Sequence, residues 1–190
     1  MSQITQRLAE LGISLPQAVA PVANYVPFVR SGALVFVSGQ ICIGPDGLIK
    51  GKVGTDMDLA AGQAAARLCG LNLIAQFAAA CDGNLDRVAR VVRLGGFIAA
   101  GPAFTDIPKV INGCSDLMVE VFGEKGRHAR SAVGMGSLPR GIPVEIEVIV
   151  EIEADAPPPR VAAARPAAKP KAAPKPKAAP KAKAAKKKKI

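Results

Sequence analysis

The sequence predicts an α+β domain, in which a sheet carries helices on one of its faces. The first observation is a strand pattern at 144–151, where apolar side chains alternate with side chains that are mostly acidic. The second is a long run rich in alanine and leucine at 57–81, which is typical of a buried helix. Weaker patterns complete the order β-β-α-β-α-β-β, which favours an α+β sheet with both helices on one face.

The first residues, 2–11, are predicted to form a short amphipathic helix. Ile4, Leu8 and Leu11 fall on one stripe of such a helix, and Gly12 ends the pattern. This helix would precede the domain as an N-terminal extension.

Two strands are expected next, at 26–30 and 34–38. The pair Ser31-Gly32 between them is typical of a turn. Pro27 lacks a backbone N–H, which indicates that the first strand lies at an edge or is bulged.

The long helix is predicted over 57–81. Thr55 and Asp58 have the three-residue spacing of a capping box immediately before the apolar run. The helix carries few polar residues, which indicates burial on more than its sheet-facing side. Gly62 and Gly70 weaken helix propensity and therefore indicate a close approach of another backbone.

A strand, a second helix and two final strands are expected after it. The strand at 88–94 leads on to Phe97. Asp106 and Pro108 then begin an amphipathic helix that ends at Gly123.

The stretch 127–150 is predicted to be an antiparallel hairpin. A short run around Arg130 is followed by a turn rich in glycine and proline and by the alternating strand that contains Glu145. Such a hairpin would bring Arg130 and Glu145 close together, although a one-residue slip in register would change the faces they share. An arginine beside a carboxylate can bind a carboxylated ligand and position a water, or it can be a surface ion pair.

Charge divides the chain into two parts. Residues 1–154 hold 13 Lys+Arg and 14 Asp+Glu, a net charge of −1, whereas residues 155–190 hold 12 Lys+Arg and one acid, a net charge of +11. The second part is rich in alanine, proline and lysine and is predicted to be disordered. It could bind nucleic acid non-specifically or an acidic lipid surface, or it could serve only as a solvating tail.

The cysteines lack the paired spacing of a zinc site. No apolar signal core occurs, and no run of about 18 apolar residues free of charge predicts a membrane span. We therefore expect reduced thiols and a cytoplasmic location, with most thiols acting as small buried hydrophobes. The four thiols belong to Cys42, Cys69, Cys81 and Cys114.

Several separated segments together resemble the Rid family, the YjgF-like proteins that are also called the endoribonuclease L-PSP family. The main signature is Ala129-Arg130-Ser131, Leu138-Pro139 and Val144-Glu145-Ile146-Glu147. Tyr25, Ser38-Gly39-Gln40, Phe97 and Val110-Ile111-Asn112 follow the order of the family. The resemblance spans 20–153, between an extension at 1–19 and the tail at 154–190. It implies a chorismate-mutase-like fold and a homotrimer whose clefts lie between subunits.

The resemblance also implies a cofactor-free, metal-free hydrolysis of small 2-imino acids and their enamine tautomers, such as 2-aminoacrylate, to 2-oxo acids and ammonia. Arg130 would hold the substrate carboxylate, because its planar fork binds a carboxylate in bidentate fashion. Glu145 would orient the attacking water and act first as general base and then as acid. Tyr25, Gly39 and Asn112 match substrate-binding positions.

Each of these residues also has a structural interpretation. Arg130 could form an interface salt bridge, and Glu145 could be a solvated strand residue. Tyr25 could be buried with a local hydrogen bond, Gly39 could serve a turn, and Asn112 could make a helix-start hydrogen bond.

Two departures from the family pattern leave other functions open. His128 stands where the better-known deaminases often have proline, and Ala132 stands where they commonly have cysteine. We interpret His128 as structural or as part of the pocket rim. The alternatives are a non-catalytic member that binds a small ligand, and an RNA-directed, endoribonuclease-like protein whose tail binds nucleic acid. The net charge of −1 over residues 1–154 argues against strong RNA binding by the folded part.

Overall fold

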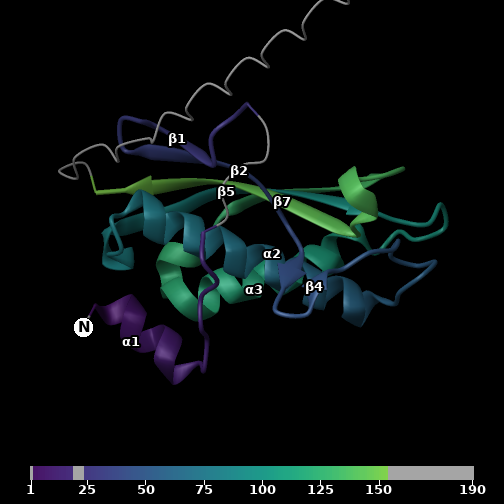
Figure 1. Ribbon diagram of the computed structural model, residues 1–190, viewed down its shortest axis with the longest axis horizontal. Coiled ribbons are helices and arrows are strands. Elements are labelled where there is room, and N and C mark those ends of the chain that lie inside the picture. Colours follow the sequence, from purple (N-terminus) through teal and green to yellow (C-terminus); the bar gives the residue numbers. More distant parts are fainter. Residues whose placement is uncertain (1, 19–23, 154–190) are drawn as a thin grey trace, which may run out of the picture.

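The computed structural model describes residues 2–18 and 24–153 (Figure 1). The predicted basic tail at 154–190 lies outside the described residues, as do parts of the predicted extension. Within the described ranges, no helix has both the length and the apolar character needed to cross a membrane.

Five strands form the main sheet, in the order β1-β2-β7-β5-β6. All neighbouring strands are antiparallel except β5 and β6, which run parallel. A two-stranded hairpin, β3 (Ile43–Gly44) with β4 (Gly47–Leu48), stands apart. The five strands are β1 (Phe28–Ser31), β2 (Leu34–Ile41), β5 (Val88–Ala99), β6 (Ala129–Met135) and β7 (Val144–Ile152).

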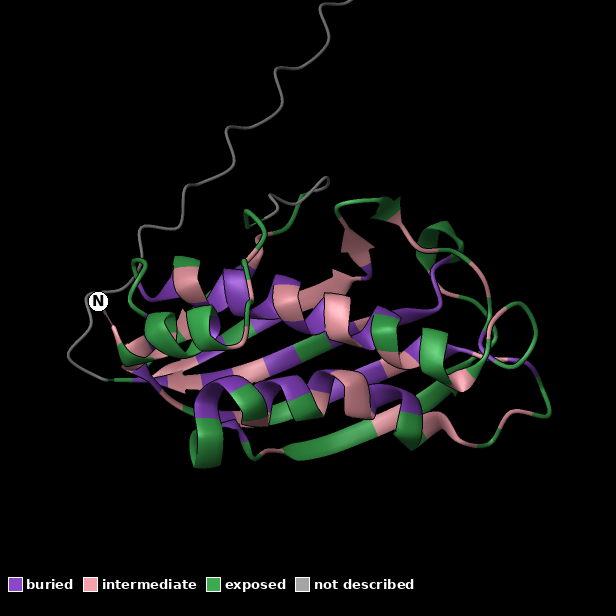
Figure 2. Ribbon diagram, turned by 90° about the horizontal axis from the view of Figure 1, so that it is seen from below, coloured by how far each residue is buried: buried purple, intermediate pink, exposed green. Residues whose placement is uncertain are grey.

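Two long helices, α2 (Leu59–Ala80) and α3 (Ile107–Phe122), cover one face of this sheet, which confirms the predicted α+β class (Figures 1 and 2). The side chain of Asp58 accepts a hydrogen bond of 2.8 Å from the amide of Ala61 and is itself the N-cap of α2. The predicted capping box led by Thr55 is therefore wrong, because the acidic residue begins the helix instead of lying inside its first turn.

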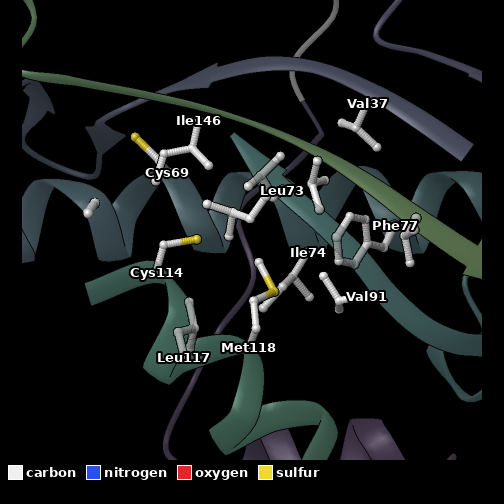
Figure 3. Packing of buried hydrophobic residues seen from close by; sticks show 14 of the residues in the cluster. Val37, Cys69, Leu73, Ile74, Phe77, Val91, Cys114, Leu117, Met118 and Ile146 are labelled. Carbon is white, nitrogen blue, oxygen red and sulfur yellow. The ribbon is translucent and has the colours of Figure 1, made fainter. Parts of the chain in front are cut away.

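The core lies between the sheet and the helices, and α2 is buried on two sides, as predicted. A Cβ added to Gly113 of α3 would overlap the backbone carbonyl of Gln63, so the two helices meet backbone to backbone at this point. A Cβ at Gly70 would lie 2.9 Å from Leu117 Cδ2. Figure 3 shows residues of α2 packed against α3, among them Cys69, Leu73, Phe77, Cys114, Leu117 and Met118.

The predicted hairpin of β6 and β7 is wrong. Both strands pair with β5, which is twelve residues long and lies between them. Because β6 runs parallel to β5 and β7 antiparallel to it, the segment 136–143 passes around the end of β5 instead of forming a tight turn. The glycine- and proline-rich pattern predicted the connection correctly. It did not predict that the two strands joined by this connection pair with β5 instead of with each other.

The helix predicted at 2–11 forms as α1 (Gln3–Glu10) and packs on the rest of the described chain. The carboxylate of Asp86 accepts hydrogen bonds of 2.9 and 2.8 Å from the amides of Gln3 and Ile4. Arg7 Nε donates to the carbonyl of Glu120 in α3 at 3.0 Å. Hydrogen bonds from these amides stabilise the ionised carboxylate and therefore lower the pKa of Asp86, and the bond from Ile4 has the larger effect.

No helix of the described residues covers the other face of the sheet (Figure 1). Pairing places Val29 of β1 beside Phe36 of β2, and Phe36 beside Ile149 of β7, all on this face. Val29 and Phe36 are 52% and 42% exposed. This uncovered sheet face therefore presents large apolar side chains to its surroundings.

Candidate functional site

Arg130 lies on the exposed edge strand β6 and points to the helix side of the sheet. Its strand neighbour is Leu94 of β5, which is a core residue on that side. Arg130 Nη1 donates to Asn112 Oδ1 at 2.8 Å and to Ser115 Oγ at 3.0 Å, both on α3. The structure therefore brings Arg130 and Asn112 together, and Asn112 bonds to this guanidinium instead of to the helix start.

The position of α3 determines where these two acceptors lie. Asn112 and Ser115 are three residues apart and thus share one side of the helix. Gly113, between them, packs on the backbone of α2. On the other side, a Cβ at Gly126 would overlap the carbonyl of Met118, so the segment that leads into β6 also packs directly on α3. These close contacts hold the acceptors at a defined distance from β6.

The guanidinium of Arg130 is only partly used within the chain. Both of its hydrogen bonds come from Nη1, and Nε and Nη2 have no partner among the described residues. No ion pair involves Arg130 in the described part of the chain. The free edge has the fork geometry that binds a carboxylate in bidentate fashion. An intramolecular salt bridge therefore does not explain this arginine.

Glu145 lies on β7 beside a bulge in β2. Pairing between these strands shifts register between Val37 and Gln40, which places Gly39 against the glutamate. A Cβ added to Gly39 would overlap Glu145 Oε1 and would lie 3.0 Å from its Cδ. The carboxylate is thus packed on bare backbone, and the glycine is needed for this contact.

Partial burial raises the pKa of Glu145 above its usual value, and the charge of the neighbouring Glu147 raises it further. A carboxyl group with a raised pKa can accept a proton from water and return it later, which is what a general base and acid requires. Glu145 is half-buried, so it differs from a fully solvated strand residue.

Tyr25 belongs to the same end of the sheet as Gly39. Ser38, next to Gly39, donates from its hydroxyl to the carbonyl of Val26 at 2.8 Å and from its amide to the carbonyl of Pro27 at 2.9 Å. These bonds tie the segment of Tyr25 to the bulged part of β2. Tyr25 itself is 50% exposed, so the buried interpretation does not hold within one chain.

Arg130 and Glu145 do not meet within one chain, contrary to the predicted hairpin. Arg130 shares a face with Leu94, whereas Glu145 shares a face with Phe97 on the same strand β5. Leu94 and Phe97 are three positions apart, and side chains an odd number of positions apart point to opposite faces. The candidate residues therefore form two half-sites, one with Arg130 and Asn112 and the other with Glu145, Gly39 and Tyr25.

Ser115 is part of the arginine half-site and was not predicted. Its hydroxyl lies 3.0 Å from His128 Nε2, while His128 Nδ1 lies 2.7 Å from the carbonyl of Gly126. The three-residue spacing of Ser115 from Asn112 indicates that both lie on one side of the helix. This spacing points to the site only once α3 is known to face β6. The hydroxyl of Ser131, by contrast, accepts a hydrogen bond of 3.4 Å from Arg93.

The described residues contain no group of three or more histidine, cysteine or acidic side chains that could hold a metal ion. The four thiols are buried in the core and free. Burial raises the pKa of Cys114 to about 12, which makes it a poor nucleophile in the folded state.

Comparisons with known proteins agree on one family. Residues 5–145 match the family described as "YjgF/chorismate_mutase-like, putative endoribonuclease". Protein TCP17 of Trypanosoma cruzi is 47% identical over 152 residues, which cover 79% of this chain and 94% of that protein. The 2-iminobutanoate/2-iminopropanoate deaminase of Dermatophagoides farinae is 29% identical over 143 residues, which cover 74% of this chain and 95% of that protein. The crystal structure of Atu1372 from Agrobacterium tumefaciens has a TM-score of 0.73 at 50% identity and covers 79% of this chain and 94% of its own. The chain belongs to the YjgF/chorismate mutase-like family.

Proposed function

We propose that this protein hydrolyses small 2-imino acids and their enamine tautomers to 2-oxo acids and ammonia, without a cofactor. The observation that carries the proposal is the guanidinium of Arg130, which is fixed from one side and open on its Nε and Nη2 edge. A carboxylate is the ligand that fits this edge. The relative named as a 2-iminobutanoate/2-iminopropanoate deaminase supports the choice of substrate.

The reaction adds water to the C=N bond. The substrate reacts as the protonated imine. Glu145 takes a proton from the water as the water oxygen attacks the imine carbon and the C=N π electrons move to nitrogen, which gives a neutral carbinolamine. Glu145 passes this proton to the amine nitrogen, the C–N bond breaks to release ammonia, and the hydroxyl gives its proton to Glu145 as the C=O bond forms. One water is consumed and one ammonia is released, and the raised pKa of Glu145 suits it to these proton transfers.

A second copy of the chain would complete the site. The two half-sites lie on opposite faces of one sheet, so no single chain can place Arg130 and Glu145 on one small substrate. The uncovered face carries exposed apolar residues, namely Val29, Phe36 and Val133, which are suited to burial between subunits. We propose a homotrimer with head-to-tail contacts, in which Arg130 of one copy faces Glu145 of the next.

The test is ammonia release from freshly generated 2-iminopropanoate or 2-aminoacrylate by three variants. We expect Arg130→Ala to lower kcat/KM by about 30-fold to 5000-fold, since loss of one partner of a buried charged pair costs roughly 2–5 kcal/mol. Arg130→Lys should recover only part of this loss because lysine cannot bind in bidentate fashion.

Arg127→Ala is the matched control. Arg127 is a nearby exposed arginine that pairs with Glu124 at 2.9 Å, away from the half-sites. Its substitution should leave turnover unchanged. Equal turnover by Arg130→Ala and wild type would refute the proposed function, as would loss of the same size in Arg127→Ala.

The non-catalytic alternative shares the arginine half-site and differs in outcome. A ligand-binding member would bind a 2-oxo acid such as pyruvate in an Arg130-dependent way and would release no ammonia from the imine. Calorimetry with pyruvate beside the ammonia assay separates the two functions, because binding without turnover assigns the protein as a binder.

A further inference from the structure

An unbroken chain of hydrogen bonds leads from a backbone carbonyl to the guanidinium of Arg130. It runs from the carbonyl of Gly126 to His128 Nδ1 at 2.7 Å, from His128 Nε2 to Ser115 Oγ at 3.0 Å, and from Ser115 Oγ to Arg130 Nη1 at 3.0 Å. The proposed reaction uses Arg130 but assigns no part to His128 or Ser115.

The direction of each hydrogen bond follows from its fixed end. A carbonyl oxygen only accepts, so Nδ1 of His128 must carry the proton that it donates to Gly126. In the neutral ring Nε2 is then an acceptor, and the Ser115 hydroxyl donates to it. With its hydrogen so oriented, Ser115 Oγ turns its lone pairs to Arg130 Nη1, which only donates.

The two ends of this chain are attached to rigid backbone. Gly126 packs against the carbonyl of Met118 in α3, where a side chain would not fit. Ser115 lies on the same helix, one turn before Met118. The carbonyl and the hydroxyl therefore keep a constant separation, and the imidazole of His128 spans it.

We propose that His128 and Ser115 are positioning residues, which hold Arg130 so that the free edge of its guanidinium meets the carboxylate of the ligand. Asn112 alone would leave Nη1 tethered at one point, about which the guanidinium could turn. The hydroxyl oxygen of Ser115, which His128 orients, is the second acceptor and fixes the plane of the guanidinium. The effect on turnover rests on the proposed function, whereas the hydrogen-bond chain itself can be tested without any substrate.

The first test uses the fact that His128 is the single histidine of the chain. Nitrogen NMR of the ring in ligand-free, full-length protein, at a pH well above the ordinary imidazole pKa of about 6.5, reports which nitrogen carries the proton. We expect the Nδ1–H tautomer, and we expect Ser115→Ala to shift the Nε2 resonance. Ser131→Ala is the control, because Ser131 bonds to Arg93 and should leave the histidine signals unchanged. An Nε2–H tautomer, or signals insensitive to Ser115→Ala, would overturn the proposal.

The second test separates positioning from chemistry. Ser115→Ala and His128→Ala should each raise KM about tenfold, near the worth of one hydrogen bond to a charged group, with kcat little changed. Ser115→Thr keeps the hydroxyl and should restore KM. A fall in kcat with unchanged KM, or no rescue by threonine in a folded variant, would contradict a positioning role.

The two tests keep the two proposals distinguishable. If the wild-type protein releases no ammonia, the proposed function fails, and the same variants are compared by their affinity for pyruvate. An Arg130-dependent affinity that falls in Ser115→Ala still supports the positioning role. An affinity that depends on Arg130 but is unchanged in both Ser115→Ala and His128→Ala refutes it, whatever the turnover.

Discussion

Replacing Gly39 with alanine should inactivate the protein without unfolding it. The new Cβ would overlap Glu145 Oε1 and would lie 3.0 and 3.1 Å from Cδ and Cγ of the same side chain. The three atoms nearest to the new Cβ all belong to Glu145, so the substitution acts first on the proposed general base.

The effect on stability should be small and the effect on rate large. Gly39 does not use a positive φ, so alanine fits the backbone and gains about 0.4–1 kcal/mol by restricting the unfolded chain. Turning Glu145 away from its preferred rotamer costs about 0.5–1.5 kcal/mol, which nearly offsets this gain. The carboxylate, however, must move by roughly 1 Å, and such a misplacement costs on the order of 100-fold in rate.

The assay pairs ammonia release with thermal unfolding. Gly136→Ala is the matched control, because Gly136 has nothing within 4 Å of an added Cβ and no positive φ. We expect Gly39→Ala to lose about 100-fold in kcat with a Tm within a few degrees of wild type, and Gly136→Ala to change neither. Full activity of Gly39→Ala would refute the placement of the base against this glycine.

Three further outcomes are expected. First, the raised pKa of Glu145 means that the folded state loses stability as pH rises through that pKa. Glutamine carries no charge, so Glu145→Gln should raise Tm more at about pH 7 than at about pH 4. An equal change at both values would contradict the pKa shift. Second, Asp86→Ala removes both acceptors at the start of α1. The free energy of unfolding should fall by about 1 kcal/mol, and amide hydrogen exchange should speed up at residues 3–10. Unchanged exchange would show that the Asp86 contacts do not hold α1. Third, because residues 155–190 carry a net charge of +11, ending the chain at Glu153 should abolish salt-dependent binding to nucleic acid and leave ammonia release intact; binding with the same salt slope would assign the tail a solvating role.

Local patterns predicted the elements well because they depend on neighbouring residues. The alternation at 144–151 matches β7 (Val144–Ile152), whose odd-numbered residues point away from the helices. The apolar run at 57–81 matches α2 (Leu59–Ala80), whose Gly62 and Gly70 lie closest to side chains of neighbouring elements. Strand alternation and the apolar composition of the helix were sufficient for these predictions.

Strand partners could not be predicted in the same way. The segment between β6 and β7 is short enough for a hairpin, yet β5 lies between the two strands. Pairing with β5 buries Leu94 and Ile98 between the flanking strands, a tertiary gain that no window of local sequence contains. Arg130 and Glu145 were therefore predicted as neighbours, although they lie on opposite faces of the sheet.

The contribution of Ser115 to the site escaped prediction for a related reason. It lies 15 residues from Arg130 in sequence, and the two meet only because α3 packs beside β6. His128 was interpreted as structural or as part of the pocket rim, and the structure places it behind the arginine. A side chain that acts through another residue leaves no local pattern of its own.

A site shared between two copies is tested most directly by mixing two inactive variants, Arg130→Ala and Glu145→Gln, as equal amounts of differently tagged chains. Each variant alone lacks one half-site at every interface. In a head-to-tail trimer, every ring that contains both variants has both groups intact at one of its interfaces and not at the others. We therefore expect the purified mixed trimer to regain ammonia release at about a third of the wild-type rate. A mixed oligomer no more active than its separate variants would contradict the shared site.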